Sequence, residues 1–200
     1  MFNGKDADLK LGERLSKLKS GLLLHACCGP CATAVTERII EFIKPTLYYY
    51  NPNIYPKAEY ELRLRQLEKV AKHFGVKLIC EPYDEVEFFS RVVGLEKEKE
   101  GGKRCPSCFS LRLEKTAKRA VEYGYGAICT TLTVSPHKNA TLINGIGETI
   151  AGENSLTWIL SDFKKRNGYL RSVELSEEIG LYRQSYCGCR FALGSENDNA

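Results

Sequence analysis

The stretch "LLLHACCGPCAT", residues 22–33, joins an apolar run to three closely spaced cysteines, and it decides the fold prediction. The apolar run is continuous and ends before the Gly29-Pro30 pair, as a strand buried on both faces of a parallel sheet does. Pro30 stands at a favoured first position of a helix, and apolar residues then recur at three-to-four spacing. The stretch therefore predicts a strand over residues 20–26, a turn, and a helix from Pro30.

The same alternation continues along the chain. The pattern predicts further strands over 45–51, 76–84 and 127–132, and helices over 56–75, about 107–123 and around 139–152. Strands separated by helices indicate an α/β fold with a doubly wound, mainly parallel sheet. We expect a single domain over residues 20–193, preceded by an N-terminal extension (1–19) and followed by a polar tail (194–200).

Composition and charge restrict the class of protein. The 200 residues fit one domain, and no apolar run approaches the roughly 18 to 20 residues that cross a bilayer. The N-terminal stretch is charged throughout and lacks the apolar region of a secretory signal. We therefore expect a soluble, cytoplasmic protein with no membrane partner. The net charge of +4 permits a nucleic-acid partner but lacks the strong basic bias of a dedicated binder.

Nine cysteines are unusual in a chain expected in the cytoplasm, where thiols are kept reduced. Clustered cysteines there indicate metal binding or redox chemistry. Cys27 and Cys28 follow the first strand and can face one pocket in loop geometry, and the helix that starts near Cys31 favours the thiolate form. The alternative is that these cysteines are small buried hydrophobic residues.

Two further clusters follow. Cys105 and Cys108 form a C-x-x-C in "KRCPSCF", which suits two ligands of one metal or cluster, or a dithiol redox couple. With the first cluster they provide enough thiolates for an iron–sulfur cluster or a zinc ion. Cys187 and Cys189 form a C-x-C, in which a disulfide would be strained and easily reduced, as labile or catalytic disulfides are. The alternative is a second pair of metal ligands.

Other polar residues are expected at the carboxyl ends of the parallel strands, where open α/β sheets bind ligands. Asp84 ends the third strand and is a candidate catalytic residue, as a proton source or non-cysteine ligand; the alternative is a helix cap before "EVEFFSRV". His137, in the turn "SPHKN", is a candidate proton donor. His25 is expected to pack or to hydrogen-bond behind the ligands. Cys80 and Cys129 are expected to be buried structural thiols.

Two motifs are missing. No C-x-x-x-C-x-x-C occurs, so the usual radical-SAM signature is absent. No Gly-rich phosphate loop follows the first strand, where "CCGPC" stands instead, which argues against nucleotide hydrolysis.

The motifs "HACCGPC", "NPNIYP", "CPSC", "TTLTVSPHKN" and "LYRQSYCGC" follow one another in this order, and the chain resembles the epoxyqueuosine reductase QueH family over roughly residues 20–193. The resemblance implies a HUP-like (adenine nucleotide alpha hydrolase-like) fold. It also implies reduction of the epoxide of epoxyqueuosine, in a tRNA anticodon loop, to the cyclopentene of queuosine. No corrinoid-binding motif is present, so we expect no cobalamin.

The resemblance also implies site residues. By motif position, Cys27, Cys28, Cys105 and Cys108 correspond to ligands of a 4Fe-4S cluster, and Cys187 with Cys189 to a redox-active pair. Cys31 matches a third N-terminal cysteine and is a further candidate metal ligand. The thiolates left over could hold an additional iron ion. The reaction also requires an electron donor as a partner.

Two rival functions remain open at this point. A zinc-stabilised RNA-binding module would use the cysteines structurally, and a general thiol–disulfide oxidoreductase would need no metal. For a tRNA partner, the aromatic residues of "YYYNPNIYP" can stack on bases. Candidate contacts to phosphates are Lys57, Arg63, Arg65, Lys103, Arg104, Lys138, Lys164, Lys165 and Arg166.

Overall fold

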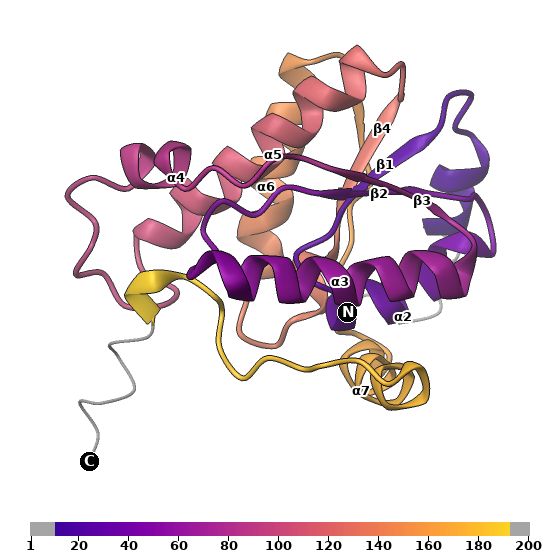
Figure 1. Cartoon of the computed structure of the whole chain (residues 1–200). Helices are drawn as coiled ribbons and strands as arrows, with labels where there is room; N and C mark the ends of the chain where they lie inside the picture. Colours follow the sequence, from indigo (N-terminus) through magenta and orange to yellow (C-terminus); the bar gives the residue numbers. More distant parts are fainter. Residues whose placement is uncertain (1–10, 193–200) are drawn as a thin grey trace.

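The computed structural model describes residues 11–192 and has a five-stranded sheet at its centre (Figure 1). The strand order is β3-β2-β1-β4-β5, and every pair of neighbours is parallel. The strands are β1 Leu22–His25, β2 Thr46–Tyr49, β3 Lys77–Cys80, β4 Ala127–Thr130 and β5 Thr157–Trp158. This confirms the α/β prediction, and the sheet agrees with the HUP-like fold that the resemblance implies.

Helices connect the strands and cover both faces of the sheet. They are α2 Gly29–Ile40, α3 Lys57–Phe74, α4 Val86–Arg91, α5 Arg104–Glu122, α6 Ala140–Glu153 and α7 Gly168–Ile179, with short 3-10 turns η1 Thr131–Val134 and η2 Arg190–Ala192. The helices predicted over 56–75 and 107–123 are present with slightly shifted ends. The sequence analysis did not predict α7 or the two-residue strand β5.

Two cores lie on opposite faces of the sheet. Leu22 and Leu24 of β1 are fully buried in the core beneath α2 and α3, whereas Leu23 is buried in the core beneath α5 and α6. Successive side chains of a strand point to opposite faces, so a strand covered by helices on both sides must be apolar throughout. This explains the continuous run that opens the chain's first strand.

The turn after β1 is held close to a neighbouring helix. A Cβ atom on Gly29, the first residue of α2, would lie 2.8 Å from the backbone carbon of Gln66 in α3. Only glycine allows this approach without moving one of the helices. The glycine within "CCGPC" therefore sets the position from which α2 presents the cysteines.

The folded part of the chain begins earlier than the predicted domain boundary at residue 20. The polar tail and residues 1–10 lie outside the described residues. Residues 11–16, part of the expected extension, are helical, and Leu11 and Leu15 are buried in the core beneath α2 and α3. Among residues 11–192, no helix combines the length and apolar character that crossing a membrane requires.

Cys80 differs from its prediction. It was expected to be a buried thiol, but it is exposed at the end of the edge strand β3, whereas Cys129 in β4 is fully buried as expected. An edge strand pairs with one neighbour and is less covered by helices, and the apolar pattern of a short strand does not reveal its place in the sheet.

Candidate functional site

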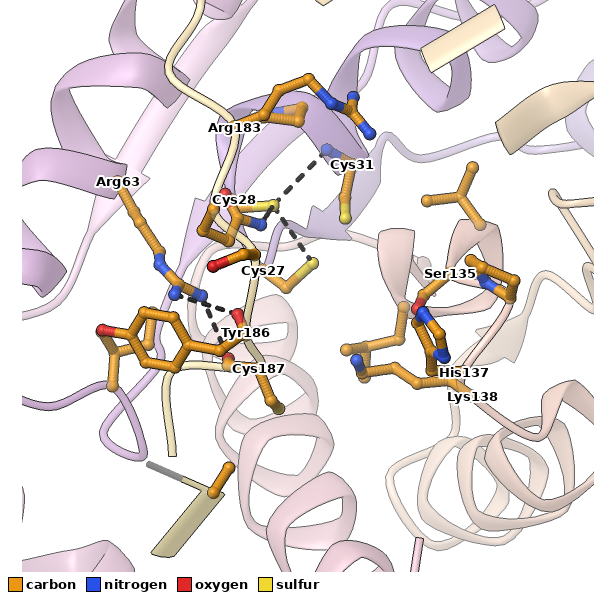
Figure 2. A pocket seen from close by; sticks show the side chains of 18 of the residues that line it. Cys27, Cys28, Cys31, Arg63, Ser135, His137, Lys138, Arg183, Tyr186 and Cys187 are labelled. Atoms are coloured by element: carbon orange, nitrogen blue, oxygen red, sulfur yellow. Dashed lines mark hydrogen bonds between the residues drawn. The ribbon is translucent and has the colours of Figure 1, made fainter. Parts of the chain in front are cut away.

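The carboxyl ends of β1, β2 and β4 meet at a pocket of about 420 Å³, lined by Cys27, Cys28, Cys31 and Cys187 among others. Figure 2 shows Ser135, His137 and Lys138 across this pocket from the first three cysteines. The residues come from the turn after β1 and from the segment after η1. The structure thus brings together polar residues that are about a hundred positions apart in the sequence.

The first three cysteines form one group. Their sulfur atoms lie within 4.8 Å of one another, a spacing that suits a shared metal ion. Cys28 caps α2, since its Sγ accepts a hydrogen bond from the backbone N–H of Cys31 at 3.5 Å. The backbone N–H of Cys27 donates to Thr131 Oγ1 (3.1 Å), and the Thr131 hydroxyl donates to Cys27 Sγ (3.4 Å). The turn therefore holds three sulfur atoms in a fixed arrangement.

The three thiols share negative charge unequally. Hydrogen bonds from Cys28 and Cys31, together with the positive charges of Arg112 and Lys138, hold the pKa of Cys27 well below its usual value. The hydrogen bond to Cys27 raises the pKa of Cys28 to about 12 and also raises that of Cys31. One thiolate is thus stabilised by two thiols, and deprotonation of the other two requires an additional positive charge such as a metal ion.

Cys105 and Cys108 line a second, smaller pocket of about 90 Å³ together with Cys187 and Cys189. Cys105 and Cys108 lie one turn apart at the start of α5, so they share a face of that helix. Burial raises the pKa of Cys108 to about 12. Both pockets are lined by Cys187, so the smaller pocket adjoins the larger one and all seven motif cysteines border this joined space.

The segment after α7 carries Cys187 and Cys189 across the site. Arg63 of α3 is 3% exposed and donates hydrogen bonds to the carbonyl oxygens of Tyr186 (3.2 Å) and Cys187 (3.0 Å). Cys189 forms an isolated antiparallel bridge with Ile54. The segment runs past α3 to the start of α5, as Figure 1 shows in yellow. Within residues 11–192 all the cysteines are free thiols.

A buried polar network lies beneath the cysteines. Arg112, 2% exposed, donates to Asn51 Oδ1 (2.6 Å) and to His25 Nε2 (3.3 Å). The other ring nitrogen of His25 lies 2.8 Å from Thr130 Oγ1. Burial, with the positive charge of Arg112, lowers the pKa of His25 to about 3, so the imidazole is neutral. Both ring nitrogens are thereby engaged by protein groups, which places His25 behind the cysteines rather than among the ligands.

This environment fits an anionic metal–sulfur group. Arg112 bonds no carboxylate among residues 11–192, and its nearest anionic candidates are sulfur atoms, with Nη1 3.9 Å from Cys108 Sγ. Lys138 lines both pockets and is partly buried. A buried charge without a partner is costly, and an iron–sulfur cluster held by four thiolates carries net negative charge. The donor set and the buried cations therefore both fit such a cluster.

Of the remaining candidate catalytic residues, the structure places His137 at the pockets and Asp84 away from them. His137 is exposed and lines both pockets, in keeping with its predicted place at the rim. Asp84 is exposed and lines neither pocket; its Oδ1 accepts a hydrogen bond from the backbone N–H of Val86, the first residue of α4, at 2.9 Å. The N-cap of α4 is Glu85, so Asp84 lies one residue before the cap position that the alternative assigned to it. Glu100, which the sequence analysis did not single out, supplies the carboxylate that lines both pockets.

Two of the residues predicted to contact phosphates are buried instead. Arg63 and Arg104 are 3% and 2% exposed, and their guanidinium groups bond backbone carbonyl oxygens, so they are not available to phosphates. A sequence pattern shows the charge of an arginine but not the distant loop that covers it. No sequence signal marked Arg112 either, since it lies on a regular amphipathic helix.

Comparisons with known proteins point to one family. The model of the family described as epoxyqueuosine reductase QueH matches residues 22–195. A protein of Streptococcus pyogenes serotype M1 named epoxyqueuosine reductase QueH is 42% identical over 181 residues, which cover 88% of this chain and 71% of that protein. The protein of the same name from Thermotoga maritima is 39% identical over 177 residues, covering 86% of this chain and 90% of its own length.

A solved structure was also matched. NMN synthetase from Francisella tularensis gives a TM-score of 0.49 at 11% sequence identity, over 94% of this chain and 77% of the other.

Proposed function

The chain belongs to the epoxyqueuosine reductase QueH family, and from this premise we propose that it reduces the epoxide of epoxyqueuosine in the anticodon loop of tRNA to the cyclopentene of queuosine. The reaction consumes two electrons and two protons and releases the epoxide oxygen as water. The observation that supports it best is the convergence of all seven motif cysteines on two adjoining pockets. Both pockets are also lined by Arg112, which is buried and bonds no carboxylate among residues 11–192.

We propose that Cys27, Cys28, Cys105 and Cys108 hold a 4Fe-4S cluster. Cys27 and Cys28 reach the joined pockets from the end of β1, and Cys105 and Cys108 from the start of α5. Cys31 groups with the first pair and is the candidate ligand of an additional iron ion. When bound, such centres supply electrons one at a time and Lewis acidity.

The other residues of the chain prepare the site for this chemistry. Arg112 and Lys138 offset the negative charge of the cysteines, and neutral His25 orients the Arg112 guanidinium without adding charge. His137 and Glu100 border both pockets and are the side chains placed to deliver protons to the released oxygen. Asp84, exposed and outside both pockets, is less well placed for that role.

We propose that Cys187 and Cys189 act as a dithiol. Their oxidation to a disulfide releases two electrons and two protons, which balances conversion of the epoxide to an alkene and water. A separate reductant must then restore the thiols. The hydrogen bonds from Arg63 to the carbonyl oxygens of Tyr186 and Cys187 hold this segment at the pocket while it changes redox state.

The proposed RNA partner requires a surface for phosphates and bases. Lys138 and Arg183 line the larger pocket, and exposed Tyr169 at its edge lies beneath the guanidinium of Arg183, 5.8 Å from ring centre to Cζ. Aromatic rings beside cations are the usual means of holding single-stranded bases. We expect tRNA binding to weaken steeply as salt increases.

One experiment tests the proposed function against its rivals. Protein purified without oxygen is assayed for iron, acid-labile sulfide and zinc, and then incubated with dithionite and tRNA carrying epoxyqueuosine. Loss of one oxygen atom from the nucleoside, measured by mass spectrometry, is expected with protein that contains iron and sulfide. Folded protein that contains zinc alone and leaves the nucleoside unchanged would instead support a structural RNA-binding module. Turnover of small disulfides without metal would support a general oxidoreductase.

A further inference from the structure

The joined pockets have one acidic side chain in their wall. Among residues 11–192 that line either pocket, Glu100 is the one carboxylate, and the positively charged side chains are arginines and Lys138. Glu100 is exposed, and its carboxylate makes no hydrogen bond or ion pair with another described residue. A ligand that enters the pockets can therefore reach an unengaged carboxylate.

The loop before α5 fixes the backbone on both sides of Glu100. Arg104, which is 2% exposed, donates hydrogen bonds to carbonyl oxygens of this loop, among them that of Glu96 at 2.9 Å. Gly101 turns the chain directly after Glu100 with a φ of 86°, a left-handed conformation that glycine adopts readily. The backbone N–H of Gly101 donates to Cys105 Sγ at 3.2 Å. The position of Glu100 is thus tied to a proposed cluster ligand.

The charge of Glu100 acts on residues inside the joined pockets. Burial lowers the pKa of Lys138, but the charges of three cysteines and of Glu100 raise it above its usual value. Burial raises the pKa of Cys105, and the charges of Cys187 and Glu100 raise it further. Lys138 and Cys105 both line the smaller pocket. The carboxylate of Glu100 therefore lies close enough to the pocket to influence a ligand there.

The partner of this carboxylate must donate hydrogen bonds, because an ionised carboxylate only accepts them. An iron–sulfur cluster held by thiolates carries negative charge and has no donors, so it cannot be that partner. A cation forms the strongest such contact. A cationic group of the substrate that enters these pockets loses water and meets the positive charges of Lys138 and the arginines, which is costly unless a carboxylate offsets them.

We propose that Glu100 binds the ammonium group that links the base to the cyclopentane ring of the substrate. This inference rests on the proposed function, since epoxyqueuosine carries a secondary amine between its 7-deazaguanine base and that ring. A nearby carboxylate keeps an alkylamine protonated, and the ammonium in turn keeps the carboxylate charged. Glu100 is then a substrate-binding residue, and His137 is the side chain left to deliver a proton to the released oxygen.

The test measures binding of two tRNAs to anaerobically reconstituted protein. One carries 7-aminomethyl-7-deazaguanosine, which has an ammonium group at the proposed place, and the other carries the neutral 7-cyano-7-deazaguanosine. Neither has an epoxide, so no reaction accompanies binding. Wild type is expected to bind the aminomethyl tRNA about 10- to 100-fold more tightly, as one hydrogen-bonded ion pair allows. Glu100→Gln, which keeps the shape and removes the charge, is expected to lose most of this preference.

Glu98→Gln is the matched control on the same loop. It removes the same charge near the bound RNA, but Glu98 lines neither pocket, and its carboxylate accepts a hydrogen bond from the backbone N–H of Lys103 that glutamine can keep. Glu98→Gln is expected to retain the wild-type preference. Equal loss of preference in the two variants would reduce the effect to the overall charge of the loop and overturn the proposal.

Turnover separates substrate binding from other roles of Glu100. Glu100→Gln is expected to raise the KM for tRNA carrying epoxyqueuosine by a factor similar to the lost preference. A proton-donating Glu100 would instead keep the preference and lower the rate at saturating tRNA. A Glu100 that contacts the guanine edge, which both probe tRNAs share, would weaken both equally when replaced. Either result would overturn the proposal.

Failure of this inference and failure of the proposed function are distinguishable. If wild type reduces epoxyqueuosine but binds the two probe tRNAs equally, this inference is wrong and the proposed function stands. If wild type prefers the aminomethyl tRNA through Glu100 but does not reduce the epoxide, the ammonium site stands and the proposed function fails.

Discussion

The guanidinium of Arg112 lies one helical turn from the thiol of Cys108 on α5, with Nη1 3.9 Å from Sγ, and its other bonds go to neutral groups of Asn51 and His25. A fully buried arginine normally faces a carboxylate. Here sulfur atoms take that place, and their charge would increase on reduction of a bound cluster. Arg112 should therefore stabilise the reduced form more than the oxidised form.

Replacing Arg112 with glutamine should lower the reduction potential of the cluster. Two unit charges about 4–8 Å apart interact by roughly 2–4 kcal/mol at an effective dielectric constant of 20. For a one-electron couple this corresponds to a shift of about 90–170 mV. The potential is measured by anaerobic titration of the visible absorbance. Arg112→Lys keeps the positive charge and serves as the matched control, and its potential should stay close to that of wild type. Equal reduction potentials in wild type and Arg112→Gln would exclude this electrostatic role.

The proposed dithiol can be tested by single serine variants. Cys187→Ser and Cys189→Ser should each lower multiple-turnover reduction of the epoxide at least about tenfold, because one remaining thiol cannot form the disulfide. That factor corresponds to ~1.4 kcal/mol of activation free energy. Iron and sulfide contents should stay at the wild-type level, because neither residue belongs to the proposed ligand set. Product is quantified by mass spectrometry of digested tRNA.

Cys80 provides the matched control for those variants. Its thiol is exposed at the end of β3, outside both pockets, and Cys80→Ser should retain wild-type turnover. Full turnover in both Cys187→Ser and Cys189→Ser would remove the dithiol from the mechanism. Loss of iron from either variant would instead assign that cysteine to the metal.

The fold could be predicted from the sequence where burial leaves a local pattern. The continuous Leu run of β1 and the Gly75 that ends α3 in a left-handed conformation are signals of this kind. Strand β5 has only two residues, and no periodicity is visible at that length. The exposure of Cys80 depends on which strand lies at the edge of the sheet, which its own sequence does not encode.

The candidate site could be predicted in its cysteines but not in its supporting residues. Three cysteine motifs are visible as spacings, and the fold brings them together by placing the turn after β1, the start of α5 and the segment after α7 around two adjoining pockets. The contact between Gln184 and Cys28 joins residues 156 positions apart. The burial of Arg63 and Arg104 likewise depends on carbonyl oxygens of loops that fold over them. Such partners follow from the packing of the whole chain, and no local pattern marks them.

Acid should destabilise the fold through Glu81. This side chain is 7% exposed, and Arg119 holds it with two hydrogen bonds of 2.6 and 2.9 Å, while Tyr48 donates a third. The hydrogen bonds from Arg119 lower the pKa of Glu81 below its ordinary value of 4.5. The folded state thus binds fewer protons than the unfolded state below that pH, so the contribution of Glu81 is present above pH 4.5 and is lost as the pH falls.

Urea unfolding from pH 7 to pH 3 measures this contribution. The free energy of unfolding should fall more steeply below pH 4.5 in wild type than in Glu81→Gln, which cannot titrate. Arg119→Met should cost about 2–4 kcal/mol at neutral pH, because it leaves a buried carboxylate without its partner. Identical pH profiles for wild type and Glu81→Gln would show that other groups govern acid unfolding.

Gly29 connects helix packing to the candidate site. A Cβ atom at this position would lie 2.8 Å from the backbone carbon of Gln66, and a backbone atom cannot move aside as a flexible side chain can. Gly29→Ala should therefore push α2 away from α3 and cost about 1–3 kcal/mol of unfolding free energy. Since Cys28 directly precedes Gly29 and caps α2, the same shift should lower the iron content of anaerobically reconstituted protein.

The matched control is Gly145→Ala in α6, where a Cβ atom meets nothing within 4 Å. That variant should be unchanged or more stable by about 0.5–1 kcal/mol, because alanine favours the helix over glycine. Urea unfolding and iron analysis of the two variants separate helix propensity from packing. If Gly29→Ala matched Gly145→Ala in both measurements, α2 could shift without moving Cys28. The close contact between α2 and α3 would then not determine the positions of the cysteines.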